Sequence, residues 1–346
     1  MAFAVGLSIE TKLRNGWEML HGSSFAAAYH HPQMRELARA TAGERDAFRV
    51  LTFNSFRKNY RFEEAFLWAY GFETAGGFTN LWPMRYREIW MNVILTPIIA
   101  MDPTVVPPLN NKLYLPMLQD KGLIWAMCND DLPNCRIRPR DYYRIELLSF
   151  LNVRYIVSPY PLDDPSLELI ESRDRELLLA REELRTGEKW RLNLKGEYGT
   201  GTALFIYRNR DVLPRYFLVD RVLSYATDHE MFAALSAASV PELHQTAYVG
   251  TSTAERLPAL SLGGQQIPVE QLHATSDRVT LRTTASGTAL LTTSMGYSRF
   301  WKACVDKAPS EVLRVNHAFI GVVAPAGTHE IELFYDPPYR LGHDPC

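Results

Sequence analysis

The feature that most constrains the fold is a change in hydrophobic pattern near residue 200. After this point the chain consists of short runs in which apolar and polar residues alternate, and turns rich in Gly, Pro and Asn separate the runs. Alternation with a period of two is typical of strands with one buried face, and strands spaced by roughly ten residues are typical of sandwiches. The pattern therefore predicts a jelly-roll-like antiparallel β-sandwich over residues 201–346. The runs are TALFIYR, RYFLVDRVL, HQTAYV, DRVTLRTT, GTALLTTS, FWKACVD, EVLRVN, AFIGVVA and THEIELFYD.

The first 200 residues instead alternate helical and strand patterns. A helix is expected to begin near Pro32 and to stop at Gly43, and residues 48–53 form an apolar run typical of a buried strand. The clearest unit is a helix that ends at Asn152 and continues into the β-branched strand VRYIVS. This alternation predicts an α/β domain with a helical N-terminal part over residues 1–200, and hence an α+β chain of two domains.

Composition restricts the partners that such a chain can have. Lys and Arg number 37 and Asp and Glu number 39, so the net charge is −2, and nucleic acid is not an expected partner. Aromatic residues make up 12% of the chain, which excludes a disordered polypeptide. The longest uncharged apolar candidate, Ile89–Met101, is interrupted by Pro97 and falls short of the roughly 20 residues of a membrane helix. Four prolines between Pro97 and Pro108 predict an extended connection there.

The apolar start of the chain, MAFAVGLSI, is compatible with two structures. It reads either as an ordinary strand or as the last two turns of a membrane helix. It has no preceding basic region and no small-residue cleavage site, so it is not a secretory signal.

Two of the four cysteines lie close together in the sequence. Cys128 and Cys135 bracket CNDDLPNC, whose Asn, Asp and Pro residues allow the chain to double back. A disulfide between them would require an oxidising compartment, and two free thiols are the alternative. A zinc site is less favoured, because no His or second Cys pair lies nearby in the sequence to complete four ligands.

Motifs that carry catalysis are absent from the sequence. It contains no phosphate-binding loop, no dinucleotide-binding glycine pattern, no nucleophile elbow and no histidine spacing suited to a metal. We therefore expect neither a cofactor nor a metal. Acidic pairs such as Asp163 and Asp164 qualify by composition as the two carboxylates of a glycoside hydrolase, although turns and solvated helix faces explain them more simply. The chain alone is thus expected not to be catalytic.

Aromatic residues beside polar groups offer a surface for sugars. The face of a pyranose ring stacks on an indole, and the sugar hydroxyls pair with Asp, Asn or Arg. Trp82, Arg85 and Tyr86 lie at the start of a predicted helix, and Trp301 and Asp306 lie in the predicted sandwich. These five residues are the candidate glycan-binding residues. The alternative for the tryptophans is that they fill the cores, where large aromatic side chains contribute most.

Four separated segments carry a family resemblance. They are HPQMRELA with FRVLTF and RYREIW, then LLSFLNVRYIVS, then LFIYRNRDVLPRYFLV, and finally the region from GYSRFW to PPYRLG. Together they resemble the extracytoplasmic C-terminal region of YfhO-type bacterial membrane proteins, which are similar to GT-C glycosyltransferases. One position departs from the family pattern, because Lys307 stands where relatives have a glycine after the hairpin aspartate. The matching residues are Asn152 to Val157, Tyr207, Asn209, Leu213 to Arg215, Trp301, Asp306, Asn316, Phe319, Gly321, Pro325, Gly327, Tyr335 and Pro337.

The resemblance implies a place on the periplasmic or extracellular face of a bacterial membrane. GT-C enzymes act through an acidic residue on a loop among their membrane helices and take a polyprenyl-phosphate sugar as donor, and this machinery is not on the chain. The first hypothesis is therefore a non-catalytic accessory or glycan-binding domain of a membrane-associated GT-C-like glycosyltransferase system. Its partners would be a membrane protein, or the membrane-embedded portion of the same system, and a glycan or polyprenyl-linked sugar. The alternatives are a structural subunit docking on a larger membrane complex and a free-standing glycoside hydrolase with a β-sandwich module.

Overall fold

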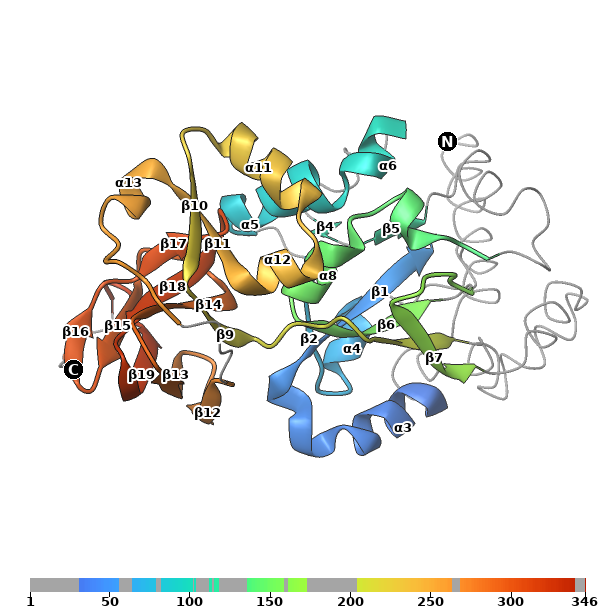
Figure 1. Ribbon diagram of the computed structural model, residues 1–346. Helices are drawn as coiled ribbons and strands as arrows, with labels where there is room; N and C mark the ends of the chain where they lie inside the picture. Colours follow the sequence, from blue (N-terminus) through green and yellow to red (C-terminus); the bar gives the residue numbers. More distant parts are fainter. Residues whose placement is uncertain are drawn as a thin grey trace, which may run out of the picture.

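A six-stranded mixed sheet and a pair of antiparallel sheets organise the chain (Figure 1). In the view of Figure 1 the mixed sheet lies at the centre and right, and the antiparallel pair lies at the left. The predicted α+β class is confirmed. The computed structural model describes residues 31–55, 64–78, 82–101, 103, 112–113, 115–117, 136–158, 161–172, 204–262, 268–339 and 346.

The mixed sheet has the strand order β2-β1-β6-β8-β7, and β5 also pairs with β1. Strand β1 runs parallel to β2, β5 and β6, whereas β8 runs antiparallel to both β6 and β7. Parallel neighbours need crossover connections, so the alternation of helices and strands in the sequence correctly predicted α/β character here. The strands are β1 (Arg49–Ser55), β2 (Glu73–Thr74), β5 (Leu115–Met117), β6 (Val153–Ser158), β7 (Leu167–Ser172) and β8 (Phe205–Asn209), with a separate antiparallel pair β3 (Gly77–Phe78) and β4 (Lys112–Leu113).

Apolar side chains on both faces of the mixed sheet are covered. Successive strand residues point to opposite faces, so Val50 packs with α3 and α4 while Leu51 and Phe53 join the larger core on the other face. Figure 1 shows α3 on one side of the sheet and α5, α11 and α12 on the other. The helices of the first part are α3 (Pro32–Ala40), a 3₁₀ helix (Ala42–Ala47), α4 (Glu64–Trp68), α5 (Met84–Ile89), a π-helical turn (Trp90–Ile94), α6 (Thr96–Met101), a 3₁₀ turn (Pro139–Asp141) and α8 (Ile145–Phe150).

A helical segment that follows the first sandwich strand packs back onto the larger core. Met231 and Leu235 of α11 and Leu243 of α12 lie in the same buried cluster as Trp90 of the π-helical turn. This segment therefore ties the sandwich to the mixed-sheet part through apolar burial. Its elements are β10 (Arg221–Tyr225), α11 (Asp228–Ala237), α12 (Val240–Gln245), β11 (Thr246–Gly250) and α13 (Thr251–Ala254), with β10 and β11 forming a parallel pair.

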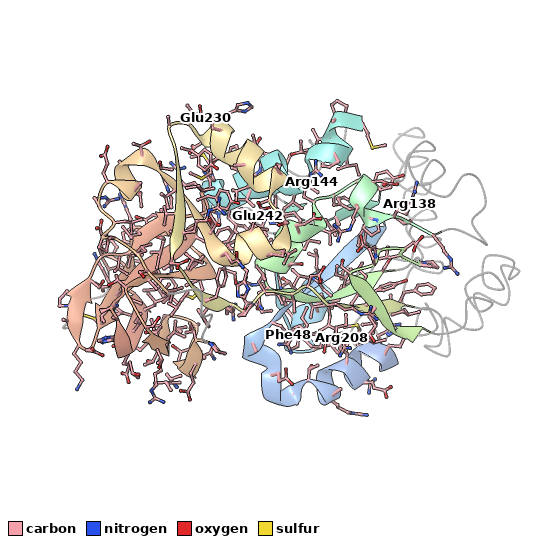
Figure 2. All side chains as sticks on the ribbon, viewed as in Figure 1. Phe48, Arg138, Arg144, Arg208, Glu230 and Glu242 are labelled. Carbon is pink, nitrogen blue, oxygen red and sulfur yellow. A yellow bond between two sulfur atoms is a disulfide. The ribbon has the colours of Figure 1, made fainter. Side chains whose placement is uncertain are left out.

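Both longer helices of this segment begin with a capping box. In α11 the Thr227 hydroxyl accepts from the Glu230 amide, and the Glu230 carboxylate accepts from the Thr227 amide. Ser239 and Glu242 make the same exchange at α12, and both glutamates are labelled in Figure 2. Reciprocal capping satisfies amides that have no partner inside the helix, which explains why short helices form here.

The C-terminal part is a sandwich of a five-stranded and a four-stranded antiparallel sheet. The two sheets share one apolar core, to which Leu281 and Ile331 contribute from one sheet and Leu291 and Val322 from the other. The strand alternation therefore predicted the sandwich correctly. It was wrong for TALFIYR, which forms β8 of the mixed sheet, and for the runs that form β10 and β11, which pair with each other outside the sandwich. The first sheet has the order β12 (Glu270–Ala274), β13 (Arg278–Ala285), β19 (Gly327–Tyr335), β15 (Trp301–Val305) and β16 (Ala308–Ser310); the second has the order β17 (Leu313–Val315), β18 (Phe319–Ala324), β14 (Ala289–Gly296) and β9 (Tyr216–Val219).

Two asparagines that match the family pattern, Asn152 and Asn209, form hydrogen bonds to the backbone where helices and strands meet. Asn152 stops α8 with a φ of 61°, and its side-chain amide donates to the Leu213 carbonyl over 2.8 Å. Asn209 donates to Ser149 Oγ and to the Val153 carbonyl, each over 3.0 Å. Asparagine tolerates the left-handed conformation of Asn152 better than most residues, and the side-chain hydrogen bonds of both asparagines stabilise the connections of α8, β6 and β9.

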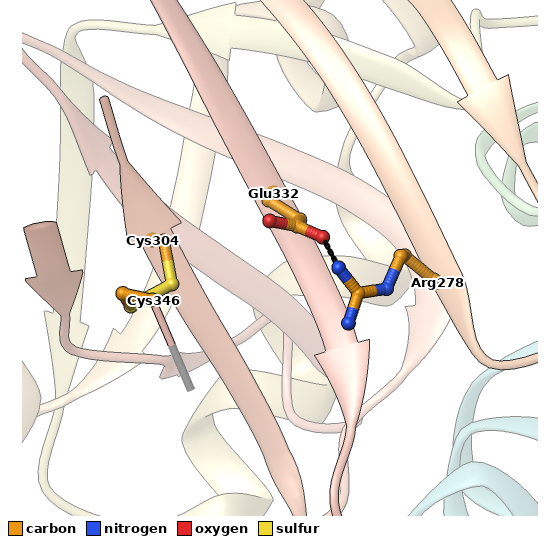
Figure 3. Close-up of a disulfide and its surroundings, with 4 residues drawn as sticks. All are labelled: Arg278, Cys304, Glu332 and Cys346. Atoms are coloured by element: carbon orange, nitrogen blue, oxygen red, sulfur yellow. Dashed lines mark hydrogen bonds and ion pairs between the residues drawn. A yellow bond between two sulfur atoms is a disulfide. The ribbon is translucent and has the colours of Figure 1, made fainter. Parts of the chain in front are cut away.

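One disulfide is described, and it joins Cys304 of β15 to Cys346 (Figure 3). Their Cα atoms are 5.9 Å apart, within the normal range for a disulfide. Figure 3 also shows the ion pair of Arg278 with Glu332 on the neighbouring strands β13 and β19. The sequence did not indicate this pairing, because 42 positions separate the two cysteines.

One expectation from the sequence is wrong in part, and two others concern residues that the structure does not describe. The extended connection predicted from Pro97 is wrong at its start, because Thr96–Met101 forms α6 with Pro97 in the first turn, where its missing amide costs no hydrogen bond. The predicted pair Cys128 and Cys135 lies outside the described residues, as does the proposed domain boundary near residue 200. Both remain predictions.

Candidate functional site

A cleft of about 480 Å³ lies where the mixed sheet meets the sandwich. Its charged lining residues lie on β1, on β2 and directly before β9. Its apolar lining residues lie mainly on β13, β14 and β15, and the β12–β13 turn also contributes. The lining residues are Arg49, Glu73, Arg215, Tyr216, Ala274, Thr275, Ser276, Val279, Met295, Gly296 and Trp301.

Among the residues that line the cleft, Glu73 lies between two arginines. Arg49 and Glu73 are direct neighbours in the parallel pairing of β1 with β2, so their side chains share one face of the sheet. Arg49 Nε donates to Glu73 Oε1 over 2.7 Å, and Arg215 pairs with Glu73 Oε2. The sequence motif that includes Arg215 thus reaches across from the sandwich to the mixed sheet.

Arg49 also binds backbone on both sides of the junction. Its Nη1 donates to the Leu151 carbonyl over 3.0 Å, to the Ser294 carbonyl over 3.0 Å and to Ser294 Oγ over 3.1 Å. The Arg49 side chain is only 8% exposed, against 43% for Glu73. The arginine is therefore a structural tie, while the carboxylate is the charged group that remains accessible.

The two arginines control the ionisation of Glu73. Burial raises the pKa of the Glu73 carboxyl, but the charges and hydrogen bonds of Arg49 and Arg215 outweigh it and lower that pKa to about 2. Glu73 consequently remains a carboxylate throughout the physiological range. It can accept hydrogen bonds but cannot supply a proton as a general acid.

The lining also includes a tryptophan, Trp301, which is partly buried against the sandwich core. Trp301, at the start of β15, packs edge-on against Tyr335 with ring centroids 5.5 Å apart, which orients the indole. Val279 and Met295 extend the apolar lining, and Thr275 and Ser276 contribute hydroxyl-bearing residues. An indole, a permanent carboxylate and hydroxyl groups in one cleft suit a ligand with both an apolar face and hydroxyl donors.

The structure separates the five predicted glycan-binding residues. Trp301 lies in the cleft. Trp82 and Tyr86 stack on each other with centroids 5.7 Å apart, and Tyr86 also packs edge-on against Phe319 at the larger core. Arg85 lies 3.5 Å from the Asp228 carboxylate at the start of α11. None of these observations tests sugar binding, which remains a prediction for all five.

Asp306 occupies the β15–β16 turn, where both of its carboxylate oxygens have partners. Asp306 and Lys307 have φ values of 49° and 66°, so the tight hairpin forms although lysine replaces the usual glycine. His329 Nδ1 donates to Asp306 Oδ2 over 2.6 Å, and the Glu330 amide donates to Oδ1 over 2.9 Å. His329 Nε2 donates to the Ala326 carbonyl over 2.8 Å. The imidazole thus faces an acceptor at each nitrogen.

We expect this His329 contact to make stability depend on pH. The hydrogen bond to Asp306, followed by that to the Ala326 carbonyl, raises the pKa of His329 above its usual 6.5. A raised folded pKa gives stability that is fully present below pH 6.5 and is lost as the pH rises through the folded value. His329→Gln should therefore lower the melting temperature at pH 6, and the difference from wild type should shrink at higher pH. Thermal melts across pH 5–9 measure it, with His273→Gln, an exposed histidine on β12, as control. A difference that is constant with pH would contradict the prediction.

Sequence reasoning did not predict the charged residues that line the cleft. Arg49 begins an otherwise apolar buried strand, and a charge in such a position requires a partner, which was an available signal. Glu73 lies in a glycine-rich stretch and gave no signal of its own. Arg215 was noted only as part of a family-like motif.

In the part of the chain that the structure describes, no group of three or more His, Cys, Asp or Glu side chains is arranged to hold a metal ion. None of its helices combines the length and apolar character that crossing a membrane requires.

The fold and the cleft define an α+β protein with a β-sandwich and a small-molecule-sized cleft at the junction of its parts. Residues 248–342 match the family model described as bacterial membrane protein YfhO. The resemblance stated from the sequence is thereby confirmed for this region, which begins within β11 and includes most of the sandwich. No curated protein and no solved structure matches the chain.

Proposed function

We propose that this chain is a non-catalytic glycan-binding part of a membrane-associated, GT-C-like glycosyltransferase system and that it acts outside the cytoplasm. The observation that carries the proposal is the cleft that both Trp301 and Glu73 line. The match to a bacterial membrane protein family supports association with a membrane system. The partners would be the membrane-embedded portion or a separate membrane protein, together with a glycan or polyprenyl-linked sugar.

The disulfide supports the extracytoplasmic placement. Disulfides persist in oxidising compartments such as the periplasm and the cell exterior and are rare in the reducing cytosol. The Cys304–Cys346 bond would therefore form after export.

The electrostatics of the cleft support a binding role over hydrolysis. A glycoside hydrolase needs a protonated carboxyl as general acid beside a second carboxylate. Among the described lining residues Glu73 is the acidic one, and its pKa of about 2 is opposite to what a general acid needs. Glu73 is instead suited to accept hydrogen bonds from a bound sugar.

We expect Trp301→Ala to weaken glycan binding by tenfold or more, because truncating a central aromatic residue of a binding site costs about 2 kcal/mol. The measurement is a glycan array on the whole chain, followed by calorimetric titration of the best ligand. Trp68→Ala is the matched control, since this indole is 51% exposed and lies outside the cleft lining. Thermal melting shows that both variants are folded. If no glycan binds the wild type, the proposal fails, and the structural subunit becomes the better hypothesis.

A further inference from the structure

We propose that His317 is a pH-sensitive latch between the sandwich and α11, in which protonation of the imidazole at Nδ1 forms an ion pair with the Asp228 carboxylate. His317 lies in the β17–β18 turn of the sandwich, whereas α11 packs on the larger core beside the mixed sheet. The latch involves none of the described residues that line the cleft, so it goes beyond glycan binding and does not depend on it.

The β17–β18 turn fixes the position of the imidazole. Asn316 and His317 have φ values of 46° and 67°, in the left-handed region where asparagine and histidine are more frequent than most residues. Asn316 anchors the turn, because its side chain accepts from the Tyr248 amide over 2.8 Å and its own amide donates to the Tyr248 carbonyl over 2.7 Å. The His317 side chain is 1% exposed, and the Phe232 ring of α11 packs edge-on against it with centroids 4.6 Å apart. The imidazole is therefore held between the turn and α11.

The two ring nitrogens of His317 have different surroundings. Nε2 donates to Glu88 Oε2 on α5 over 2.6 Å. Nδ1 is buried, makes no hydrogen bond with any residue that the structure describes, and lies 3.4 Å from Asp228 Oδ1. A neutral imidazole carries one N–H, and the contact with Glu88 uses it, so a lone pair on Nδ1 lies near a carboxylate. Protonation places a second N–H there and converts the contact into a charge-assisted hydrogen bond.

The neighbouring charges leave the balance to this close contact. Arg85 Nη1 lies 3.5 Å from Asp228 Oδ2, and Arg314 is within electrostatic range of both residues and of Glu88. These two arginines and two carboxylates have no net charge together. The gain on protonation therefore comes from the contact of Nδ1 with Asp228. The charged and titratable groups around the imidazole are Arg85 and Glu88 on α5, Asp228 on α11, Arg314 on β17 and Tyr297 after β14.

Asp228 is placed where its carboxylate can respond. It is the first residue of α11, and its side chain is 54% exposed. The capping box of Thr227 and Glu230 satisfies the helix end, so the Asp228 carboxylate is not needed as the cap. Histidine is the side chain that ordinarily changes its charge between pH 5 and pH 8. Acidification through this range should therefore tighten the contact of α11 with the β17–β18 turn.

The test compares thermal melts of the whole chain at pH 5.5 and pH 8.5. Asp228→Asn keeps the side-chain size and the capping box but removes the charge. We expect its melting temperature to fall below that of wild type by roughly 2 °C more at pH 5.5 than at pH 8.5, because the ion pair forms only at the lower pH. Asp211→Asn, at an exposed aspartate between β8 and β9, is the matched control and should show no such difference. His329 is unchanged in every variant, so its own pH dependence cancels.

A second variant assigns the effect to His317. His317→Gln keeps an amide donor near Glu88 but cannot take up a proton, so Asp228→Asn in this background should have the same effect at both pH values. Hydrogen exchange provides a local measurement. After correction for the intrinsic exchange rate, the α11 amides should be more protected at pH 5.5 than at pH 8.5 in the wild type and equally protected in Asp228→Asn.

Two results would overturn the latch. One is a loss in Asp228→Asn that is the same at both pH values. The other is a larger loss at pH 5.5 that persists when His317 is replaced. If His317→Gln does not fold, hydrogen exchange decides, because equal α11 protection of the wild type at both pH values would also overturn the proposal.

Discussion

Replacing Arg49 with Met is expected to lower the free energy of unfolding by about 3 kcal/mol, because the buried Leu151 and Ser294 carbonyls lose their donor and each unsatisfied buried acceptor costs about 1–3 kcal/mol. The variant loses the hydrogen bonds to Glu73, to the Leu151 carbonyl and to Ser294. These bonds join the mixed sheet to the sandwich, so the loss should appear in the global transition. Chemical denaturation monitored by tryptophan fluorescence measures it.

A surface ion pair provides the control for Arg49. Arg282 pairs with Glu270 over 2.9 Å, but the two side chains are 48% and 61% exposed. Exposed pairs contribute roughly 0–1 kcal/mol, so Arg282→Met should change stability little. Equal losses in the two variants would show that burial of Arg49 contributes nothing.

The same network predicts a response to acid. Because the pKa of Glu73 is lowered from 4.5 to about 2, its stabilising contribution is present above pH 4.5 and is lost as the pH falls toward 2. Arg49→Met removes one cause of the low pKa. The stability difference between wild type and Arg49→Met should therefore decrease between pH 4.5 and pH 2.

Replacing Cys346 with Ser is expected to lower the free energy of unfolding by about 3 kcal/mol. The disulfide closes a segment with a sequence separation of 42 residues. The chain-entropy model gives about 4 kcal/mol for such a loop, and measured values are often smaller. The variant leaves Cys304 as a buried thiol, which packs as a small apolar group and adds little cost of its own. Denaturation of both proteins under oxidising conditions measures the difference.

Reduction tests whether the loss of stability in Cys346→Ser comes from the Cys304–Cys346 bond. Dithiothreitol should lower the stability of the wild type to that of Cys346→Ser. A further loss in Cys346→Ser on reduction would report the predicted pair of Cys128 with Cys135. Wild-type stability that is unaffected by complete reduction would contradict a stabilising role for the Cys304–Cys346 bond.

The fold was more predictable than the candidate site for a physical reason. Strand and helix periodicity is a local property, so runs such as VRYIVS and THEIELFYD indicated β6 and β19 correctly. Hairpin turns were also accessible, since Asp306 marked the β15–β16 turn despite Lys307. A local pattern cannot distinguish a proline in the first turn of a helix from one in an extended segment. Pro97 is such a case, because it lies in the first turn of α6.

The candidate site depended on contacts between distant segments. Trp301 was selected by its residue type, but the same reasoning selected Trp82, which stacks against Tyr86 at the core. Residue type alone could not distinguish the two positions. The charged residues of the cleft come from three separate regions of the chain, and no spacing in the sequence relates Arg49, Glu73 and Arg215.

The sequence by itself determined the α+β class, the sandwich and the family resemblance, because these follow from periodicity, turn residues and motif order. The tertiary structure alone decided that Cys304 bonds to Cys346 and that Glu73 lies between two arginines in the cleft lined by Trp301. Packing within the C-terminal part brings the two cysteines together, and pairing in the mixed sheet with docking of the sandwich against it brings the two arginines to Glu73. Both depend on long-range packing, which leaves no periodic signal in the sequence.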